Sequence, residues 1–104
     1  MTVAIDHPDA SLQAACEQLL LVEHHCVGRW SPEHPVGRWC ARCVRKHAHT
    51  AAALVDEAVA LSGHGTVYVR MQPFTRWVAD LADAGAPKET ICYAARSVRR
   101  QFMR

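Results

Sequence analysis

Apolar positions recur every three or four residues along two long stretches of the chain. This spacing places them on one face of an α-helix, so it predicts amphipathic helices over residues 11–26 and 41–61. Two glycines and two prolines break the pattern between residues 27 and 39 and separate the two helices. The expected inward positions are Leu12, Cys16, Leu19, Val22 and Cys26 in the first helix, and Val44, His47, Ala48, Ala51, Leu54, Val55, Ala58 and Leu61 in the second.

Two shorter helices are predicted in the last third of the chain, over residues 73–85 and 87–104. Pro73 and Pro87 each suit the first turn of a helix. Because the joint between these helices is short, we expect them to be close neighbours at an angle. Residues 66–70 alternate and include β-branched side chains, which favours an extended linker or an edge that pairs with a second copy. The expected inward positions are Phe74, Trp77, Val78 and Leu81, and then Ile91, Ala94, Ala95, Val98 and Phe102.

The four helices predict an all-α protein in which a single domain spans residues 1–104. Its two parts are a helical half over residues 11–62 and a helical hairpin over residues 73–103. A chain of 104 residues, 50% hydrophobic and 21% charged, suffices for one core and is too short for a dinucleotide-binding fold or an eight-stranded barrel. No apolar run approaches the roughly 20 residues of a membrane span. The N-terminal residues lack the basic region of a signal peptide, so we expect a cytoplasmic protein.

Basic side chains concentrate at the C-terminal end of a chain whose formal net charge is only +2. Residues 85–104 contain one acidic residue, Glu89, against five basic ones, which are Lys88, Arg96, Arg99, Arg100 and Arg104. A basic end of this kind is typical of proteins with an anionic partner. The alternative is a solvated helix face without a partner, and the sequence leaves both interpretations open.

The strongest chemical signal is the pair Cys40 and Cys43, with His47 four residues further on. A CxxC pair brings two sulfur atoms onto one tetrahedral ion. In a helix that begins near Cys40, the side chains of Cys43 and His47 lie on the same face. Cys26, at the end of the first helix, completes a Cys3His pattern. We therefore predict one structural zinc ion that ties the first two helices together.

The fourth zinc ligand has two main alternates, His24 and His25, which directly precede Cys26, and His34 and His49 are less favoured substitutes. Zinc itself has three alternatives, which are a pair of plain core cysteines, a redox dithiol, and an iron–sulfur cluster held by Cys26, Cys40, Cys43 and a fourth cysteine. A redox dithiol is usually found in a βαβ context that this sequence lacks. Five cysteines are an odd number, which argues against a disulfide framework. The HExxH and HxE…PCxxC patterns of catalytic zinc sites do not occur, so we expect a structural metal and no enzymatic activity.

The segment between the cysteines contains an internal repeat, because Val-Gly-Arg-Trp occurs in it twice. One interpretation is that the two indoles cover a small core and shield the sulfur atoms from water. The other is that the repeat forms an interaction surface for a phosphate with a stacked base, or for a protein. The residues of this surface would be Arg29, Trp30, Arg38 and Trp39.

The basic C-terminal hairpin predicts a helix-turn-helix-like unit, and therefore a small DNA-binding regulator of transcription. Lys88 and Tyr93, near the start of the last helix, would contact base edges. The later arginines would bind phosphates, and they are Arg96, Arg99, Arg100 and Arg104. The alternative function is a protein-interaction module, an adaptor or inhibitor that docks through the repeat or the arginine face. A homodimer is a further alternative that the sequence leaves open.

Overall fold

The computed structural model describes residues 8–27, 40–62 and 67–102 of the chain. These residues form four α-helices and contain no strand, which confirms the predicted all-α fold. The helices are α1 (Pro8–Val27), α2 (Ala41–Ser62), α3 (Val67–Asp83) and α4 (Lys88–Phe102). Three of the four agree closely with the sequence pattern, and α3 begins earlier than predicted.

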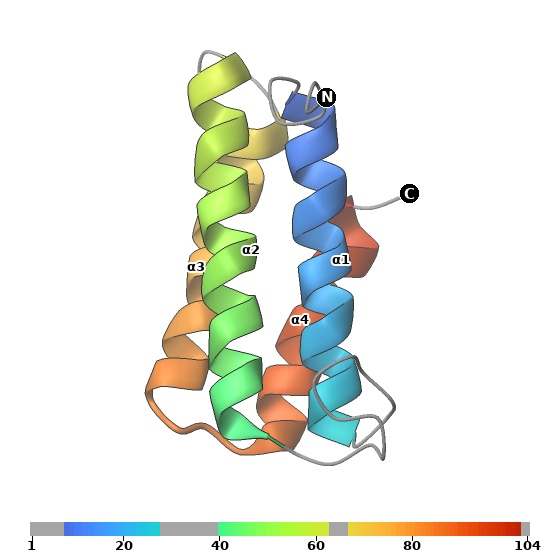
Figure 1. Ribbon diagram of the computed structural model, residues 1–104, viewed down its shortest axis with the longest axis vertical. Coiled ribbons are helices and arrows are strands. Elements are labelled where there is room, and N and C mark those ends of the chain that lie inside the picture. The colour runs from blue at the N-terminus through green and yellow to red at the C-terminus, as the bar shows by residue number, and fades with distance from the viewer. Residues whose placement is uncertain (1–7, 28–39, 63–66, 103–104) are drawn as a thin grey trace.

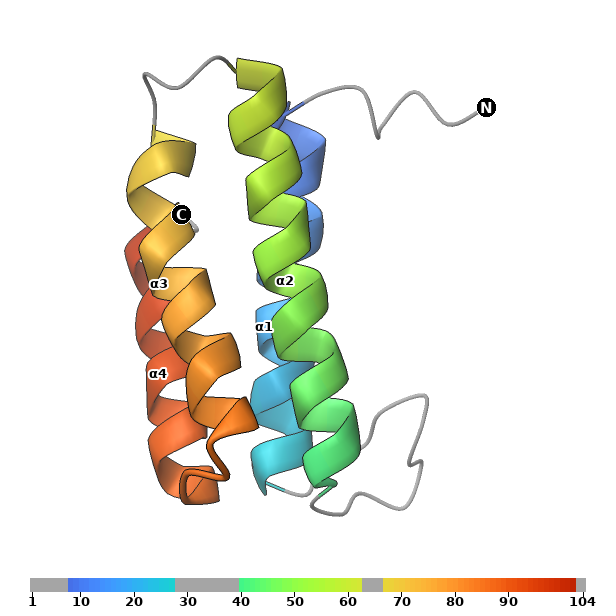
Figure 2. The ribbon, with the colours of Figure 1, turned by 90° about the vertical axis from the view of Figure 1, so that its left-hand side faces the viewer.

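The helices form an antiparallel bundle in which the chain runs alternately down and up (Figure 1). Each helix packs against the next, and α1 also packs against α4, which closes the ring. Figure 2 shows α3 and α4 side by side and antiparallel, joined by a short turn. The lower end of the bundle is defined here as the end where α1 and α3 finish and α2 and α4 begin.

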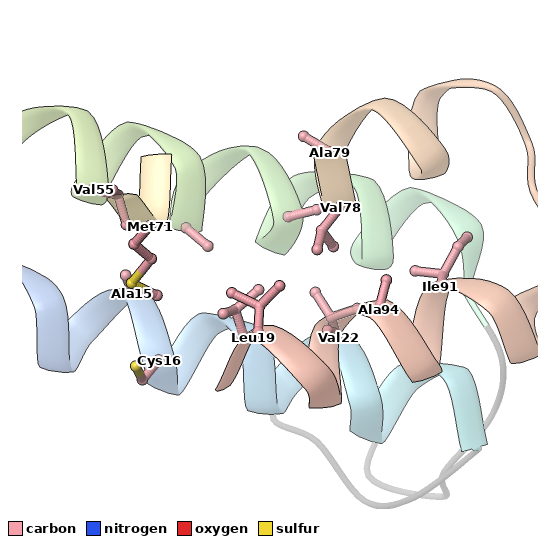
Figure 3. Close-up of a cluster of buried hydrophobic side chains, with 14 of the residues drawn as sticks. Ala15, Cys16, Leu19, Val22, Val55, Met71, Val78, Ala79, Ile91 and Ala94 are labelled. Carbon is pink, nitrogen blue, oxygen red and sulfur yellow. The ribbon is translucent and has the colours of Figure 1, made fainter. Parts of the chain in front are cut away.

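The core of the bundle receives side chains from all four helices. Figure 3 shows larger side chains such as Leu19, Met71 and Ile91 alternating with alanines, which let neighbouring helices approach closely. Cys16, as expected, and Cys92 are both buried among them and pack as small core residues. No helix in the described part of the chain is both long and apolar enough to cross a membrane.

Helix α3 corrects two expectations. It begins at Val67 instead of Pro73, so residues 67–70 are helical and form neither an extended linker nor a pairing edge. Pro73 therefore lies inside the helix, where it lacks an N–H to donate. The first turns of α3 bury Tyr68 and Met71 against α2 and the core. We attribute the early start to this burial, because tertiary packing outweighs local preference.

The inward face of α3 also differs from the predicted one. Phe74 and Trp77 are 38% and 42% exposed instead of buried, whereas Val78 is buried as expected. The small residues Thr75 and Ala79 occupy the inward positions and allow α3 to pack closely. Phe74 lies at the edge of the bundle, where its ring contacts that of Phe102 with centroids 5.7 Å apart.

The turn between α3 and α4 has the hydrogen bonds of a Schellman motif. The N–H of Ala86 donates to the carbonyl oxygen of Leu81 at 3.1 Å, and the N–H of Gly85 donates to that of Ala82 at 3.2 Å. Gly85 has a φ of 71°, a backbone conformation that residues with a Cβ rarely adopt. The turn thus reverses the chain and returns α4 along α3.

Candidate metal centre and basic surfaces

The CxxC pair lies at the start of α2, at the lower end of the bundle. Cys40 immediately precedes the helix, and its carbonyl oxygen accepts the first helical hydrogen bond from the N–H of Val44 at 3.0 Å. Its Sγ accepts a hydrogen bond from the N–H of Cys43 at 3.4 Å. Cys40 is therefore the N-cap of α2, and its sulfur lies near the positive end of the helix dipole. This position favours the thiolate form that metal ligands require.

One turn further along α2, His47 is buried against α1. Its imidazole ring stacks on that of His25, with centroids 5.3 Å apart and an angle of 20° between the ring planes. His47 Nδ1 also donates a hydrogen bond to Oε1 of Gln18 at 2.6 Å. Both histidines are almost fully excluded from solvent. The end of α1 and the start of α2 thus place two imidazoles in direct contact inside the bundle.

The structure brings some of the predicted ligands together and not others. Cys43 and His47 lie on the buried face of α2, as their spacing predicted. Of the two alternates on α1, His25 is buried against His47 and His24 is only half-buried. The side chain of Cys26 lies outside the described residues. Among the described residues, no three His, Cys, Asp or Glu side chains are arranged to hold a metal ion.

Sequence reasoning missed Gln18, which contacts His47 from α1. Gln18 lies seven residues before His25, a spacing that places the two side chains on one face of a helix. The sequence therefore shows that Gln18 and His25 share a face of α1. It does not show that this face packs against His47, because the helical pattern alone does not specify how α1 pairs with α2.

Two of the predicted phosphate-binding arginines form ion pairs with another helix of the bundle. Glu23 of α1 is buried, and it accepts hydrogen bonds from Arg96 Nε at 3.3 Å and from Arg99 Nε at 2.5 Å. A second nitrogen of Arg99, Nη2, donates to the same carboxylate at 3.2 Å. The hydrogen bond to Glu23 raises the pKa of the Arg99 guanidinium, because it stabilises the charged form. These two arginines join α4 to α1.

The other predicted contact residues of α4 lie at the surface. Lys88, Tyr93 and Arg100 are exposed. Arg104 lies outside the described residues, as do all four residues of the Val-Gly-Arg-Trp repeat that were predicted to form an interaction surface, namely Arg29, Trp30, Arg38 and Trp39.

Three cations lie at the lower end of the bundle, and two of them, Arg42 and Arg45, were not singled out from the sequence. Arg42 and Arg45 follow Cys40 on the first turns of α2, and Lys88 is the first residue of α4. All three are exposed, and none forms an ion pair within the described part of the chain. We call these three residues the basic end. The signal for the two arginines was their place in the sequence, Arg42 inside the CxxC pair and Arg45 two residues after it.

The basic end is distinguished by its place at two helix starts and not by exposure alone, because Arg70 and Arg100 are also exposed without an ion pair among the described residues. Arg76 on α3 pairs with Asp56 on α2 at 2.9 Å, and Arg96 and Arg99 pair with Glu23. At the basic end, by contrast, the cations coincide with the positive ends of α2 and α4, so the charges and the helix dipoles act in the same direction. This arrangement suits an anionic partner. Comparison with known protein families, curated proteins and solved structures finds no match to this chain.

Proposed function

We propose that the protein is a small, cytoplasmic, non-enzymatic zinc protein that binds nucleic acid, and that it acts as a regulator of transcription. The observation that carries the proposal is the basic end, where Arg42, Arg45 and Lys88 are exposed without an ion pair among the described residues. Phosphates are attracted both by these cations and by the starts of α2 and α4. The buried Glu23 holds Arg96 and Arg99 against the protein, so the basic end supplies the first contacts.

The beginning of α4 is the part of this surface suited to reading bases. Lys88 and Tyr93 are exposed there, and they are the residues that a recognition helix would present. In a helix-turn-helix unit the two helices cross at a large angle, whereas α3 and α4 run antiparallel (Figure 2). We therefore expect DNA to meet the lower end of the bundle, where α4 begins, instead of the full length of α4, whose last turn carries Arg100.

Zinc has a structural role in this proposal. The candidate ligands Cys40, Cys43 and His47 lie where α2 begins, beside the last turn of α1. A metal ion at this position would join the two helices directly beneath the basic end. It would therefore stabilise the conformation of the surface that meets the nucleic acid, without taking part in a reaction.

A salt titration of binding to random duplex DNA tests the proposed function. The logarithm of the binding constant should fall linearly with the logarithm of the salt concentration, with a slope of about −0.9 per phosphate contact. The triple variant Arg42→Gln/Arg45→Gln/Lys88→Gln should make this slope shallower by the amount expected for the loss of roughly three phosphate contacts. The matched control is Arg70→Gln, an exposed arginine at the opposite end of the bundle, which should leave the slope unchanged.

A folded protein that fails to bind DNA at low salt would exclude this function. The second candidate, a protein-interaction module, would then be preferred. It is favoured by the exposed aromatic side chains of α3, Phe74 and Trp77, which lie three residues apart and therefore close together on the helix. Equal salt slopes for the triple variant and the parent would instead show that DNA binds away from the basic end.

A further inference from the structure

The stacked histidines identify which side chains complete the metal centre. We propose that one zinc ion is held by His25, Cys40, Cys43 and His47, and that Gln18 positions His47 for this role. The inference rests on the proposed function only in that the chain is taken to hold zinc. It replaces the predicted Cys3His set by a Cys2His2 set, in which the fourth ligand comes from His25 instead of Cys26.

The first argument is the placement of the two imidazoles. His25 and His47 come from different helices and are separated by 22 positions, yet their rings are stacked and almost fully buried. A metal ion bound by one nitrogen of each ring would join α1 to α2. His24, adjacent on the same helix, is half-buried and lacks this contact with His47 among the described residues.

The second argument is the hydrogen bond of Gln18. Because the amide oxygen Oε1 can only accept, Nδ1 of His47 must carry the proton, and Nε2 is then the nitrogen with the lone pair. Metal-binding histidines in proteins almost always donate their other ring N–H to a carbonyl or carboxylate in this way, which orients the ring and makes it a better ligand. Gln18 is therefore a positioning residue, and it acts on the metal through His47.

The third argument is the position of the CxxC pair on the same helix. Cys43 precedes His47 by one turn and lies on the same buried face. The Sγ atom of Cys40 accepts a hydrogen bond from the backbone N–H of Cys43 at the start of the helix. Two sulfur and two nitrogen donors are a common tetrahedral set for zinc. Since no three ligands among the described residues converge on one point, metal binding must draw these side chains together.

Cobalt substitution distinguishes the two ligand sets, because each thiolate bound to Co²⁺ adds to a charge-transfer band in the near ultraviolet. The metal-free protein, prepared under reducing conditions, is titrated with Co²⁺ and then competed with Zn²⁺. The parent should give the tetrahedral cobalt spectrum with a charge-transfer band of two thiolates. Cys26→Ser should leave the band and the zinc affinity unchanged, whereas Cys43→Ser should halve the band or abolish binding.

The histidine ligand and its positioning residue have their own variants. His25→Ala should weaken zinc binding by at least about tenfold and change the visible bands of cobalt. Gln18→Leu, which removes the acceptor, should weaken zinc binding by about 10- to 100-fold. Gln18→Glu keeps an acceptor at this position and should restore the affinity. Gln13→Leu, at an exposed position of the same helix, is the matched control and should behave as the parent.

The outcomes separate this inference from the proposed function. A parent protein that binds neither Zn²⁺ nor Co²⁺ would overturn both the zinc protein and the ligand set. A three-thiolate band that falls by one third in Cys26→Ser, with parental affinity in His25→Ala, would overturn the ligand set alone. If His25→Ala does not fold, the band of the parent and the comparison of Gln18→Leu with Gln18→Glu still decide the result. DNA binding is measured independently of all these variants.

Discussion

The contact between Glu23 and two arginines of α4 gives the sharpest prediction for stability. The Glu23 side chain is 8% exposed, and those of Arg96 and Arg99 are 45% and 25% exposed. Arg99 is bound through both Nε and Nη2, whereas Arg96 is bound through Nε alone. Removing the arginines therefore leaves a charged carboxylate inside the protein. The resulting loss of free energy of unfolding should be larger for Arg99 than for Arg96.

The expected magnitudes follow from burial and geometry. Arg96→Gln removes a half-exposed partner and should cost about 0–1 kcal/mol of the free energy of unfolding. Arg99→Gln removes a two-point, charge-assisted contact and should cost about 1.5–3 kcal/mol. The double variant leaves Glu23 buried without either cation and should cost about 3–5 kcal/mol, the range found when one partner of a buried ion pair is removed. For a domain of this size, such a loss lowers the melting temperature by at least roughly 10 °C.

Urea unfolding followed by far-ultraviolet circular dichroism measures these losses. Arg100→Gln is the control, because Arg100 is exposed and forms no ion pair among the described residues. The free energy of unfolding of this control should stay within about 0.5 kcal/mol of that of the parent. The variant Glu23→Gln/Arg96→Gln/Arg99→Gln should recover part of the loss, since the buried charge is then gone. A double arginine variant as stable as the Arg100 control would refute the reasoning.

Two further predictions concern the turn and the core. Gly85→Ala should lower the free energy of unfolding in urea by about 1 kcal/mol, because Gly85 has a positive φ that strains a residue with a Cβ. An added Cβ meets no neighbouring atom, so this backbone strain is the whole expected cost. Unchanged stability would contradict the Schellman turn. Burial raises the pKa of the Cys16 thiol, because it disfavours the charged thiolate. As far as this thiol is concerned, the folded protein is therefore fully stable below the ordinary thiol pKa, and it loses stability as the pH rises from that value through the raised pKa. Alkylation followed by mass spectrometry should modify Cys16 only when the protein unfolds, and rapid labelling of the native protein would disprove its burial.

Helices α1, α2 and α4 could be predicted from the sequence because their signals are local. Apolar residues at spacings of three and four define each inward face, and proline and glycine mark the breaks between helices. The same local spacing placed Cys43 and His47 on one face of α2. The start of α3 was missed because residues 66–70 have a local preference for extended backbone. The burial of Tyr68 and Met71 against other helices outweighs that preference.

Roles that depend on two helices were decided by the tertiary structure. The sequence shows a basic last helix, but the partner of Arg99 is Glu23, which lies 76 residues away in the chain. Likewise, the sequence shows several histidines and cysteines, but the stacking of His25 on His47 follows from how α1 packs on α2. Helical periodicity specifies which side chains share a face, and only the packing of the faces determines which charges are paired and which imidazoles meet.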